Sequence, residues 1–392
     1  MQPSSLRVAL FTGNYNYVRD GATQAMNRLV GFLLEQGAAV RIYAPTTKEP
    51  AVEAVGDLVS VPSVPMGLGR GEYRVALGLP PGVRRDIETF RPNVMHIATP
   101  DILGHRALSY AARIKIPSLA SLHTRFETYP RYYRLALLEP LFERVLARFY
   151  NRAGLVLVPA QSMTALLRSW GVKSPISIWS RGVDKDDFNP GRRSLEWRRS
   201  LGIAEDDFVL GFCGRLVKEK GLEVYCEVAR VLAAADPTFK ALIVGEGPER
   251  AWLEGQLPHG QLVGFKSGPQ LGRAIASMDV LLNPSVTETF GNVTLEALSA
   301  GVPVVAAQAT GAQDLVEDGM DGALIAPNDI AGYVDAIRRI RASPTLHQQM
   351  QQGAQRKAAN FKWDLVNRAV MESYLGLHGA ASVTAEVSAG GG

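Results

Sequence analysis

The sequence predicts an α/β protein built from two tandem, doubly wound Rossmann-like domains. Short β-branched runs of strand length alternate with longer amphipathic segments, and this alternation begins twice along the chain. A polar stretch near residues 185–200, punctuated by Pro190 and Gly191, separates the two series. The length of 392 residues also exceeds what a single hydrophobic core usually supports.

The first series predicts a parallel sheet with helical crossovers. Strands are expected at 7–12, 38–44, 94–98, 117–123 and 155–160, and helices at 22–36, 104–114 and 133–152. Several of these strands end on polar or small residues, which is typical of positions that line ligands in doubly wound sheets.

The second series repeats this scheme after the polar stretch. Strands are expected at 207–214, 239–245, 260–264, 279–285 and 302–307, and helices at 221–235, 248–256, 269–277 and 291–300. We therefore expect an N-terminal domain over 1–190 and a C-terminal domain over 191–378, whose last helix could cross back to the first domain. Residues 379–392 are small and polar and predict a disordered tail.

Composition and charge favour a reduced, cytoplasmic protein. The 42 basic residues are nearly balanced by 38 acidic ones, so the net charge of +4 is weak support for nucleic-acid binding, and no nucleic-acid partner is expected. The same charge would suit a negatively charged small substrate or an anionic membrane surface. Cys213 and Cys226 are too few for a disulfide framework. The N-terminus resembles a first β-strand more than a secretory signal, and no apolar run is long enough to span a membrane.

Two cations follow the first strand of the second series. In GRLVKEKG, residues 214–221, Arg215 and Lys220 emerge at a strand's carboxyl end just before a helix, where they could hold a diphosphate. Taken alone, such a short run is as readily explained as a solvated basic turn.

Two carboxylates flank a glycine turn further along the chain. In ETFGNVTLEALSAGVPVV, residues 288–305, Gly291 leads into a helix whose N–H groups offer a positive dipole end to phosphate oxygens. Glu288 in the loop could meet sugar hydroxyls, and Glu296 within the helix could meet a ribose. A lone glutamate on an amphipathic helix is usually only solvent-facing, but its combination with GRLVKEKG favours a site.

These two segments, together with VGEGP at 244–248, resemble the family 4 retaining glycosyltransferases of the GT-B fold. The resemblance covers nearly the whole chain and implies an active site in a cleft between two Rossmann-like domains. It implies that Arg215 and Lys220 neutralise the donor diphosphate, that Glu288 contacts the transferred sugar and that Glu296 holds the ribose. The remaining residues that it implies for donor binding in this half are Gly245, Glu246, Gly247, Phe265, Phe290, Gly291, Asn292 and Val293.

In the N-terminal half the resemblance implies two further positions. The loop GNYNYVRDG at 13–21 stands where the family often shows a paired glycine, and only Gly21 matches, so Gly21 is expected near the phosphates and Asp20 only as a helix cap. His123 ends a strand where family members place a histidine near the donor sugar, although a lone histidine there is more often structural. The RGVD of 181–184 resembles a structural loop of the family.

The acceptor is indicated by a basic and aromatic stretch. Residues 124–153 combine six arginines with interleaved tyrosines and phenylalanines, which suits a membrane interface or, alternatively, packing into the N-terminal domain. HTRFETYPRYY, WSRGVDKDDFNP and ETFGNVTLEA resemble the lipid-glycosylating subgroup, which includes plant-type sulfoquinovosyl-diacylglycerol synthases and bacterial mannosyltransferases. This implies a peripheral membrane enzyme that transfers a hexose or uronic acid to a diacylglycerol- or ceramide-type lipid, with a soluble or polysaccharide acceptor as the alternative.

The expected chemistry is retention of configuration without a metal or other cofactor. No carboxylate cluster has metal-ligand spacing, and no second carboxylate is placed as a nucleophile, so attack and departure on one face are expected. Asn292 resembles GDP-mannose users whereas HTRFETYPRYY resembles UDP-sugar users, so the donor base stays open. A sugar-nucleotide epimerase or hydrolase and a non-catalytic scaffold are the rival classes. GEGPER at 245–250 lacks the third glycine of a dinucleotide fingerprint, and no Walker A sequence occurs.

Overall fold

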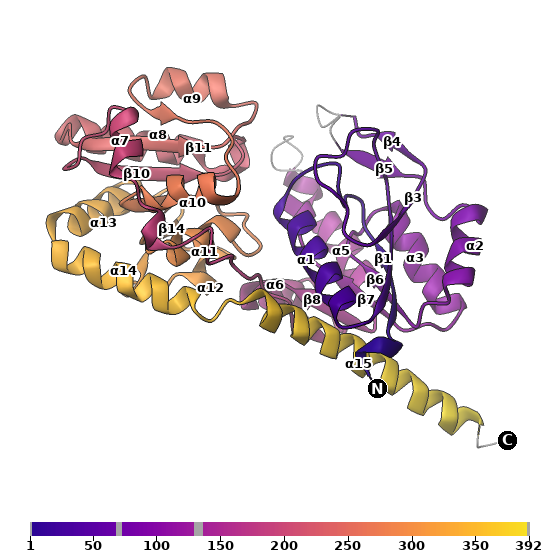
Figure 1. The fold of residues 1–392 in the computed structure, drawn as a ribbon. Coiled ribbons are helices and arrows are strands. Elements are labelled where there is room, and N and C mark those ends of the chain that lie inside the picture. The colour runs from indigo at the N-terminus through magenta and orange to yellow at the C-terminus, as the bar shows by residue number, and fades with distance from the viewer. Residues whose placement is uncertain (1, 68–72, 129–135, 390–392) are drawn as a thin grey trace. The chain divides into compact units, whose positions relative to one another are not determined.

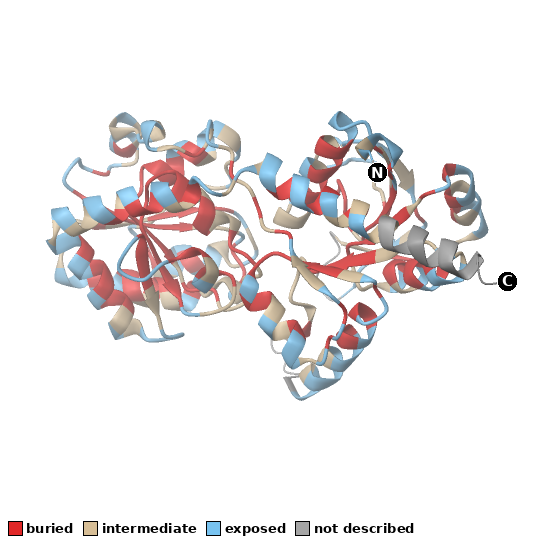
Figure 2. Cartoon of the chain, turned by 90° about the horizontal axis from the view of Figure 1, so that it is seen from below, coloured by how far each residue is buried: buried red, intermediate tan, exposed pale blue. Residues whose placement is uncertain are grey.

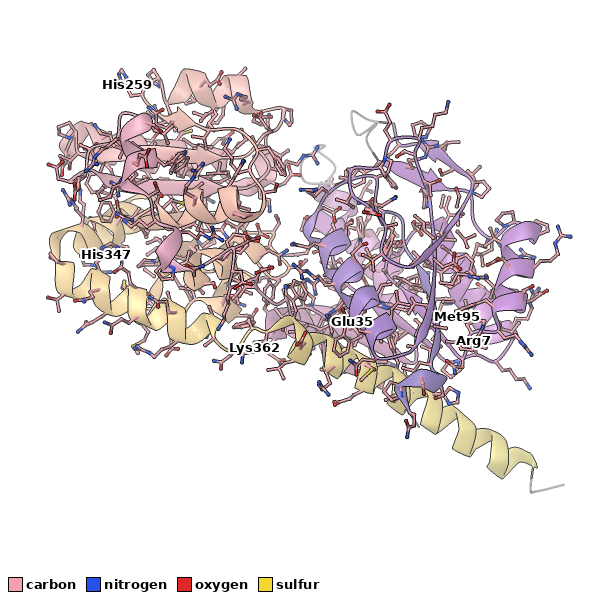
Figure 3. All side chains as sticks on the ribbon, viewed as in Figure 1. Arg7, Glu35, Met95, His259, His347 and Lys362 are labelled. Carbon is pink, nitrogen blue, oxygen red and sulfur yellow. The ribbon has the colours of Figure 1, made fainter. Side chains whose placement is uncertain are left out.

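A computed structural model describes residues 2–67, 73–128 and 136–389 (Figure 1). The chain divides into two compact units, which we call unit 1 and unit 2. Unit 1 comprises Met1–Ser180 together with Trp363–Gly392, and unit 2 comprises Arg181–Lys362. Lys362, which is labelled in Figure 3, is therefore the last residue of unit 2 before the chain returns to unit 1.

Unit 1 contains a seven-stranded sheet in the order β3-β2-β1-β6-β7-β8-β9, and every neighbouring pair is parallel. The strands are β1 (Arg7–Phe11), β2 (Ala39–Ala44), β3 (Asp57–Ser60), β6 (Val94–Ile97), β7 (Ser118–Ser121), β8 (Leu155–Val158) and β9 (Ile176–Ile178). A separate antiparallel hairpin pairs β4 (Ser63–Pro65) with β5 (Arg74–Ala76). Strand order reverses beside β1, since β2 and β6 flank it, which makes unit 1 doubly wound.

The helices of unit 1 provide the crossovers that a parallel sheet requires. They are α1 (Gly21–Glu35), α2 (Pro81–Phe90), α3 (Ile102–Arg113), α5 (Glu139–Tyr150), α6 (Gln161–Ser169) and α15 (Trp363–Ala389), with short 3-10 turns at Pro3–Ser5, Phe126–Thr128 and Ala136–Leu138. Figure 1 shows α15 in yellow running alongside α1, and the two helices are in contact. The last helix of the chain thus packs on the domain built by the first residues.

Unit 2 contains a six-stranded, fully parallel sheet in the order β12-β11-β10-β13-β14-β15. The strands are β10 (Phe208–Cys213), β11 (Phe239–Val244), β12 (Gln261–Leu262), β13 (Val280–Asn283), β14 (Val304–Ala307) and β15 (Gly322–Ile325). The helices are α7 (Leu195–Ser200), α8 (Leu222–Ala235), α9 (Arg250–Gln256), α10 (Gly268–Ala276), α11 (Asn292–Ser299), α12 (Ala312–Leu315), α13 (Ile330–Ala342) and α14 (Pro344–Ala358), with 3-10 turns at Pro190–Arg192 and Lys218–Lys220.

Each unit has its own hydrophobic core, in which the central strands are buried on both faces (Figure 2). In β6 and β14 every residue is buried, as expected when helices cover both sides of a parallel sheet. The core of unit 1 includes Val366, Val370, Met371 and Tyr374 from α15. The apolar face of α15 is therefore part of the core of unit 1.

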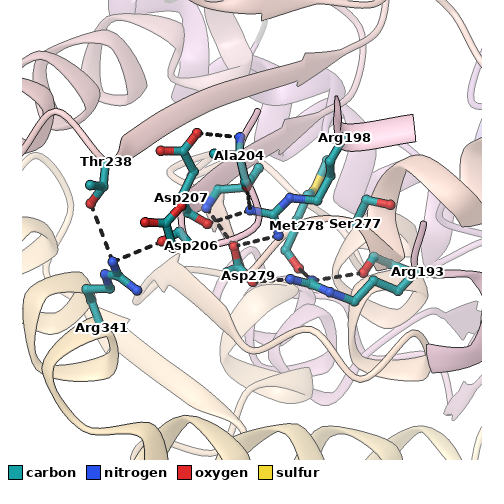
Figure 4. A network of polar contacts seen from close by, with 12 residues as sticks. Arg193, Arg198, Ala204, Asp206, Asp207, Thr238, Ser277, Met278, Asp279 and Arg341 are labelled. Atoms are coloured by element: carbon teal, nitrogen blue, oxygen red, sulfur yellow. Dashed lines mark hydrogen bonds and ion pairs between the residues drawn. The ribbon is translucent and has the colours of Figure 1, made fainter. Parts of the chain in front are cut away.

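A buried ion network fixes the segment that leads into β10 (Figure 4). Asp279 accepts from Arg193 at 2.7 Å, from Arg198 at 3.2 Å and from the backbone N–H of Val209 at 2.7 Å. Arg198 is only 1% exposed, so its charge depends on this carboxylate. The network joins α7 and β10 to the residue just before β13.

The predicted α/β class and both series of elements are confirmed, with differences at three places. The chain passes into unit 2 at Arg181, whereas the sequence indicated 190/191; the preceding loop packs on unit 2, where the Ser299 hydroxyl donates to the carbonyl of Phe188 at 2.7 Å. The predicted helix at 133–152 is described from residue 136, and α5 begins only at Glu139, with Pro140 in its first turn. The tail expected to be disordered from 379 continues α15 to Ala389, because alanine and glutamate favour helix.

Candidate functional site

The loops after β10, β11 and β13 meet at one edge of the unit 2 sheet. All three strands are parallel neighbours, so their carboxyl ends share that edge, where ligands bind in open α/β sheets. The loop after β10 carries Arg215 and Lys220, and the loop after β13 carries Glu288. The sequence predicted this grouping because each segment directly follows a strand.

Lys220 and Glu288 form an ion pair at this edge. The Nζ of Lys220 donates to Oε1 of Glu288 at 2.5 Å, and the side chains are 31% and 18% exposed. Lys220 ends a 3-10 turn, and Gly221 then adopts a φ of 72° at the N-terminus of α8. A Cβ at Gly221 would lie 3.0 Å from the carbonyl oxygen of Pro284, so the glycine allows the two loops to pack together. The sequence analysis predicted different ligands for Lys220 and Glu288, and the structure pairs the two side chains with each other.

Glu296 lies within α11 and faces the end of β10. Burial of its carboxyl raises its pKa to about 8. The pKa of the Cys213 thiol, on the last residue of β10, is raised by burial first and by the charge of Glu296 second, while Lys220 opposes the shift. Cys213 thus lies within electrostatic reach of both Glu296 and Lys220. A carboxyl held neutral near pH 7 is a group that a hydroxyl-bearing ligand can engage.

The turn into α11 exposes backbone rather than aromatic side chain. Gly291 has a φ of 99° and precedes Asn292, the first residue of the helix. The side chain of Phe290 is 4% exposed and packs edge-on against Phe361, with ring centroids 6.0 Å apart. Asn292 and Val293 are partly exposed. The N-terminus of α11 therefore presents N–H groups that can receive an anion.

The glycines after β11 have a structural reason in the packing of neighbouring loops. A Cβ at Gly245 would lie 1.9 Å from the carbonyl oxygen of Gly214, and one at Gly247 would lie 2.3 Å from that of Leu216. Glu246 between them pairs with Arg250 at 2.7 Å. Their predicted donor contacts remain predictions, as does that of Phe265, which is 58% exposed.

Gly311 is a site-related residue that the sequence analysis did not single out. It adopts a φ of 83° before α12, and a Cβ there would lie 2.8 Å from the carbonyl oxygen of Glu288. The loop after β14 thus supports the backbone of Glu288. The signal available in the sequence was a glycine immediately ahead of a short helix, which is a weak one.

His123 follows β7 in unit 1 and contacts Ser121 and Trp179. Its Nε2 lies 2.9 Å from the Ser121 hydroxyl, and its ring packs edge-on against Trp179 with centroids 5.0 Å apart. The expected cap at Asp20 is confirmed, since Asp20 accepts from the N–H of Thr23 at 2.8 Å. Gly21 is the first residue of α1. The part of HTRFETYPRYY from Tyr129 onward lies outside the described residues.

An apolar stripe on the outside of unit 1 is formed by the end of one 3-10 turn and α5. Its members are exposed by 40% or more: Leu137, Leu138, Leu141, Phe142 and Val145. The last four have helical spacing, so they share one face of α5. Arg144 and Arg148 on the same helix are also exposed. We call this surface the α5 face.

Neither a metal cluster nor a membrane-spanning helix is found within the described part of the chain. No group of three or more His, Cys, Asp or Glu side chains there could hold a metal ion. No helix there is both long and apolar enough to cross a bilayer.

The two doubly wound units have the GT-B fold. Solved structures share the architecture: a sucrose-phosphate synthase from Thermosynechococcus elongatus has a TM-score of 0.81 at 20% identity, covering 96% of this chain and all (100%) of that one. Anabaena HepE in complex with UDP and glucose has a TM-score of 0.74 at 20% identity, with 94% and 99% coverage.

The chain belongs to glycosyltransferase family 4. Residues 19–187 match the model described as Glycosyltransferase Family 4, and residues 194–357 match that of Glycosyl transferases group 1. A GDP-mannose-dependent alpha-mannosyltransferase of Mycolicibacterium smegmatis is 31% identical, covering 85% of this chain and 87% of its own. The sulfoquinovosyl transferase SQD2 of Arabidopsis thaliana is 30% identical, covering 93% and 73%. The chain is thus a transferase that uses a nucleotide-sugar donor.

Proposed function

We propose that this enzyme transfers a hexose or uronic acid, with retention of configuration, from a UDP- or GDP-sugar to a hydroxyl of a membrane lipid or glycolipid. The proposed donor site is supported by the ion pair of Lys220 and Glu288 and by the buried carboxyl of Glu296, whose pKa is raised to about 8. The α5 face supports the acceptor half. The mannosyltransferase and sulfoquinovosyl transferase activities for which the two relatives are named fit a sugar donor of this class.

In the donor site, Lys220 and Arg215 neutralise the diphosphate, and the charge that develops as the sugar leaves is stabilised by the same two cations. Donor phosphates compete with Glu288 for the Lys220 ammonium, so donor binding frees the Glu288 carboxylate for the hydroxyls of the sugar. The ion pair thereby keeps both side chains in position before the donor arrives. The ribose hydroxyls bind Glu296, and the amides of Phe290, Gly291 and Asn292 approach the sugar or phosphate.

In the transfer step, the acceptor hydroxyl attacks the anomeric carbon on the face from which the phosphate departs. The leaving phosphate oxygen accepts the hydroxyl proton, so neither a protein nucleophile nor a metal ion is required in this proposal. A covalent sugar adduct trapped on Glu288 would contradict it. Activity that survives exhaustive treatment with EDTA is expected, because protein cations do the work that a metal does in other transferases.

On the acceptor side, the α5 face suits the boundary between lipid headgroups and acyl chains. Leucine and phenylalanine side chains would enter the acyl region while Arg144 and Arg148 meet anionic headgroups. In unit 1, His123 would contact a hydroxyl of the bound sugar. A soluble sugar acceptor is the alternative, and no residue of the α5 face would then be needed for activity.

The proposal is tested by combining donor binding with product analysis. Thermal-shift titration with UDP, GDP and their sugar conjugates names the base, because a ligand of the folded state raises the melting temperature. The productive donor is then incubated with vesicles containing diacylglycerol, glucuronosyl-diacylglycerol or ceramide, and in parallel with soluble sugars. An α-linked glycolipid from an α-linked donor supports the proposal. Transfer to soluble sugars alone would overturn the lipid acceptor, and donor turnover without any acceptor would favour an epimerase or hydrolase.

A further inference from the structure

Unit 1 contains a chain of four polar side chains that ends at His123. It starts at Tyr374 on α15, whose hydroxyl lies 2.7 Å from Nδ1 of His96 on β6. Nε2 of His96 lies 2.7 Å from the Ser121 hydroxyl at the end of β7, and that hydroxyl lies 2.9 Å from Nε2 of His123. Tyr374, His96 and Ser121 are each at most 1% exposed, whereas His123 is partly exposed. The chain therefore runs from a buried phenol to a histidine that a substrate can reach.

The protons of this chain can be assigned by counting donors. Burial lowers the pKa of His96 to about 3, so its ring is neutral and carries one proton. If Tyr374 donates to Nδ1 of His96, then Nε2–H of His96 donates to Ser121, and the Ser121 hydroxyl donates to Nε2 of His123. In this direction every buried proton has an acceptor.

The other arrangements leave a buried hydroxyl proton without an acceptor. In the reversed chain, Tyr374 accepts from His96, and its own proton meets no other acceptor among the residues that the structure describes. If His96 and His123 both donate to Ser121, the Ser121 hydroxyl proton likewise meets no acceptor among the described residues. Because buried polar groups are costly to leave unpaired, the direction from Tyr374 to His123 is favoured.

We propose that Tyr374 sets the direction of this chain and so fixes His123 as the neutral Nδ1–H tautomer, with Nε2 held by Ser121. His123 would then present an N–H donor, and no acceptor nitrogen, to a substrate hydroxyl; this use of the tautomer rests on the proposed role of His123 in sugar binding. Tyr374, His96 and Ser121 are positioning residues, since none of them needs to touch the substrate. Trp179 fixes the ring planes, because it packs edge-on against both His123 and His96.

The tautomers can be read directly by NMR on the full chain labelled with nitrogen-15 in its six histidines, at neutral pH and without substrate. Loss of one signal set in His123→Asn and His96→Asn variants assigns the two rings. We expect His123 to be protonated on Nδ1 only and His96 on Nε2 only. A His123 ring protonated on Nε2 would overturn the proposal. The exposed His259, labelled in Figure 3, is the internal reference for an unconstrained ring.

The direction is tested with Tyr374→Phe, which removes the first donor and keeps the aromatic ring. The Nδ1–H pattern of His123 is expected to be lost or mixed in this variant and to persist in Tyr110→Phe, which removes a hydroxyl that binds Glu88 instead. An unchanged His123 tautomer in a folded Tyr374→Phe protein would refute the role of Tyr374. If that variant does not fold, Ser121→Ala and Ser121→Thr are compared, and only the threonine is expected to retain the pattern. The spectra need no turnover, so they fail or succeed independently of the transferase assay, in which His123→Ala tests the proposed function.

Discussion

At the residue scale, Lys218 and Lys220 lie in the same 3-10 turn but differ in their surroundings. Lys218 is exposed, whereas Lys220 binds Glu288. We predict that Lys220→Ala weakens donor binding at least tenfold, a loss of about 1.4 kcal/mol or more, because a charge-assisted contact to phosphate is removed. Lys218→Ala should leave the affinity nearly unchanged. Isothermal titration with the nucleotide identified by thermal shift measures both, and equal effects of the two variants would contradict the assigned role.

The raised pKa of Glu296 predicts a pH dependence of donor binding. In the free enzyme this carboxyl has a pKa of about 8, and ribose hydroxyls that donate to the carboxylate would lower it in the complex. Binding should therefore release a proton and become tighter as the pH rises toward about 8. Titrations in buffers of different ionisation enthalpy detect the released proton. Glu296→Gln is the control, since it should bind more weakly and lack this component of the pH dependence.

The same group makes a prediction about stability. A carboxyl whose pKa rises from 4.5 in the unfolded chain to about 8 in the folded one favours the folded state less and less as the pH rises between these values. Relative to Glu296→Gln, the wild-type protein should therefore lose free energy of unfolding from pH 5 to pH 8. Urea unfolding of both proteins at several pH values measures the difference. A difference that does not vary with pH would show that the carboxyl is not buried.

At the element scale, the α5 face predicts binding to anionic vesicles. The double variant Leu141→Ser/Phe142→Ser should reduce sedimentation with phosphatidylglycerol vesicles several-fold, because the apolar area that enters the membrane is lost. Val231→Ser removes an apolar side chain that is 37% exposed on α8 and should have no effect. Equal vesicle binding of the double variant and the wild type would contradict the role of this face.

The network around Asp279 connects elements of unit 2, and its loss should destabilise them together. Asp279→Asn leaves Arg198, which is 1% exposed, without a counter-charge, so we expect a loss of about 3–5 kcal/mol in urea unfolding. The matched control is Arg199→Ala, whose pair with Glu205 is more than 60% exposed on both side chains and should cost no more than about 1 kcal/mol. A small effect of Asp279→Asn would mean that water replaces the carboxylate.

At the scale of the whole molecule, unit 1 is completed by the end of the chain. Truncation after Lys362 removes Val366, Val370, Met371 and Tyr374 from its core, where each buried side chain contributes about 1.5–3 kcal/mol. Unit 1 should then lose its cooperative thermal transition. Truncation after His378 retains all four side chains and is expected to unfold like the full-length protein in calorimetry. A cooperative thermal transition of unit 1 in the protein truncated after Lys362 would show that unit 1 folds without α15.

The sequence by itself determined the fold class and most of the strands, because buried parallel strands are continuous apolar runs with turn residues at their ends. It also indicated that Arg215, Lys220 and Glu288 lie at one edge of the unit 2 sheet, since each lies in a segment that directly follows a strand. The strands β3, β4, β5, β9 and β15 and the helices α2, α6, α7, α12, α13 and α14 were missed. The apolar runs of the missed strands are too brief to show a period against the surrounding polar residues.

Only the tertiary structure decided the partners of these residues, because partners far apart in sequence are set by packing and not by local pattern. The pairing of Lys220 with Glu288 spans two loops, and the support of Glu288 by Gly311 depends on a third. The series of hydrogen-bonded side chains that ends at His123 begins at Tyr374 on α15, and no local sequence pattern connects Tyr374 with β7. The periodicity of a sequence indicates which side of a helix or strand is buried. The residues that pack against that buried side are determined only when the sheet and its helices assemble.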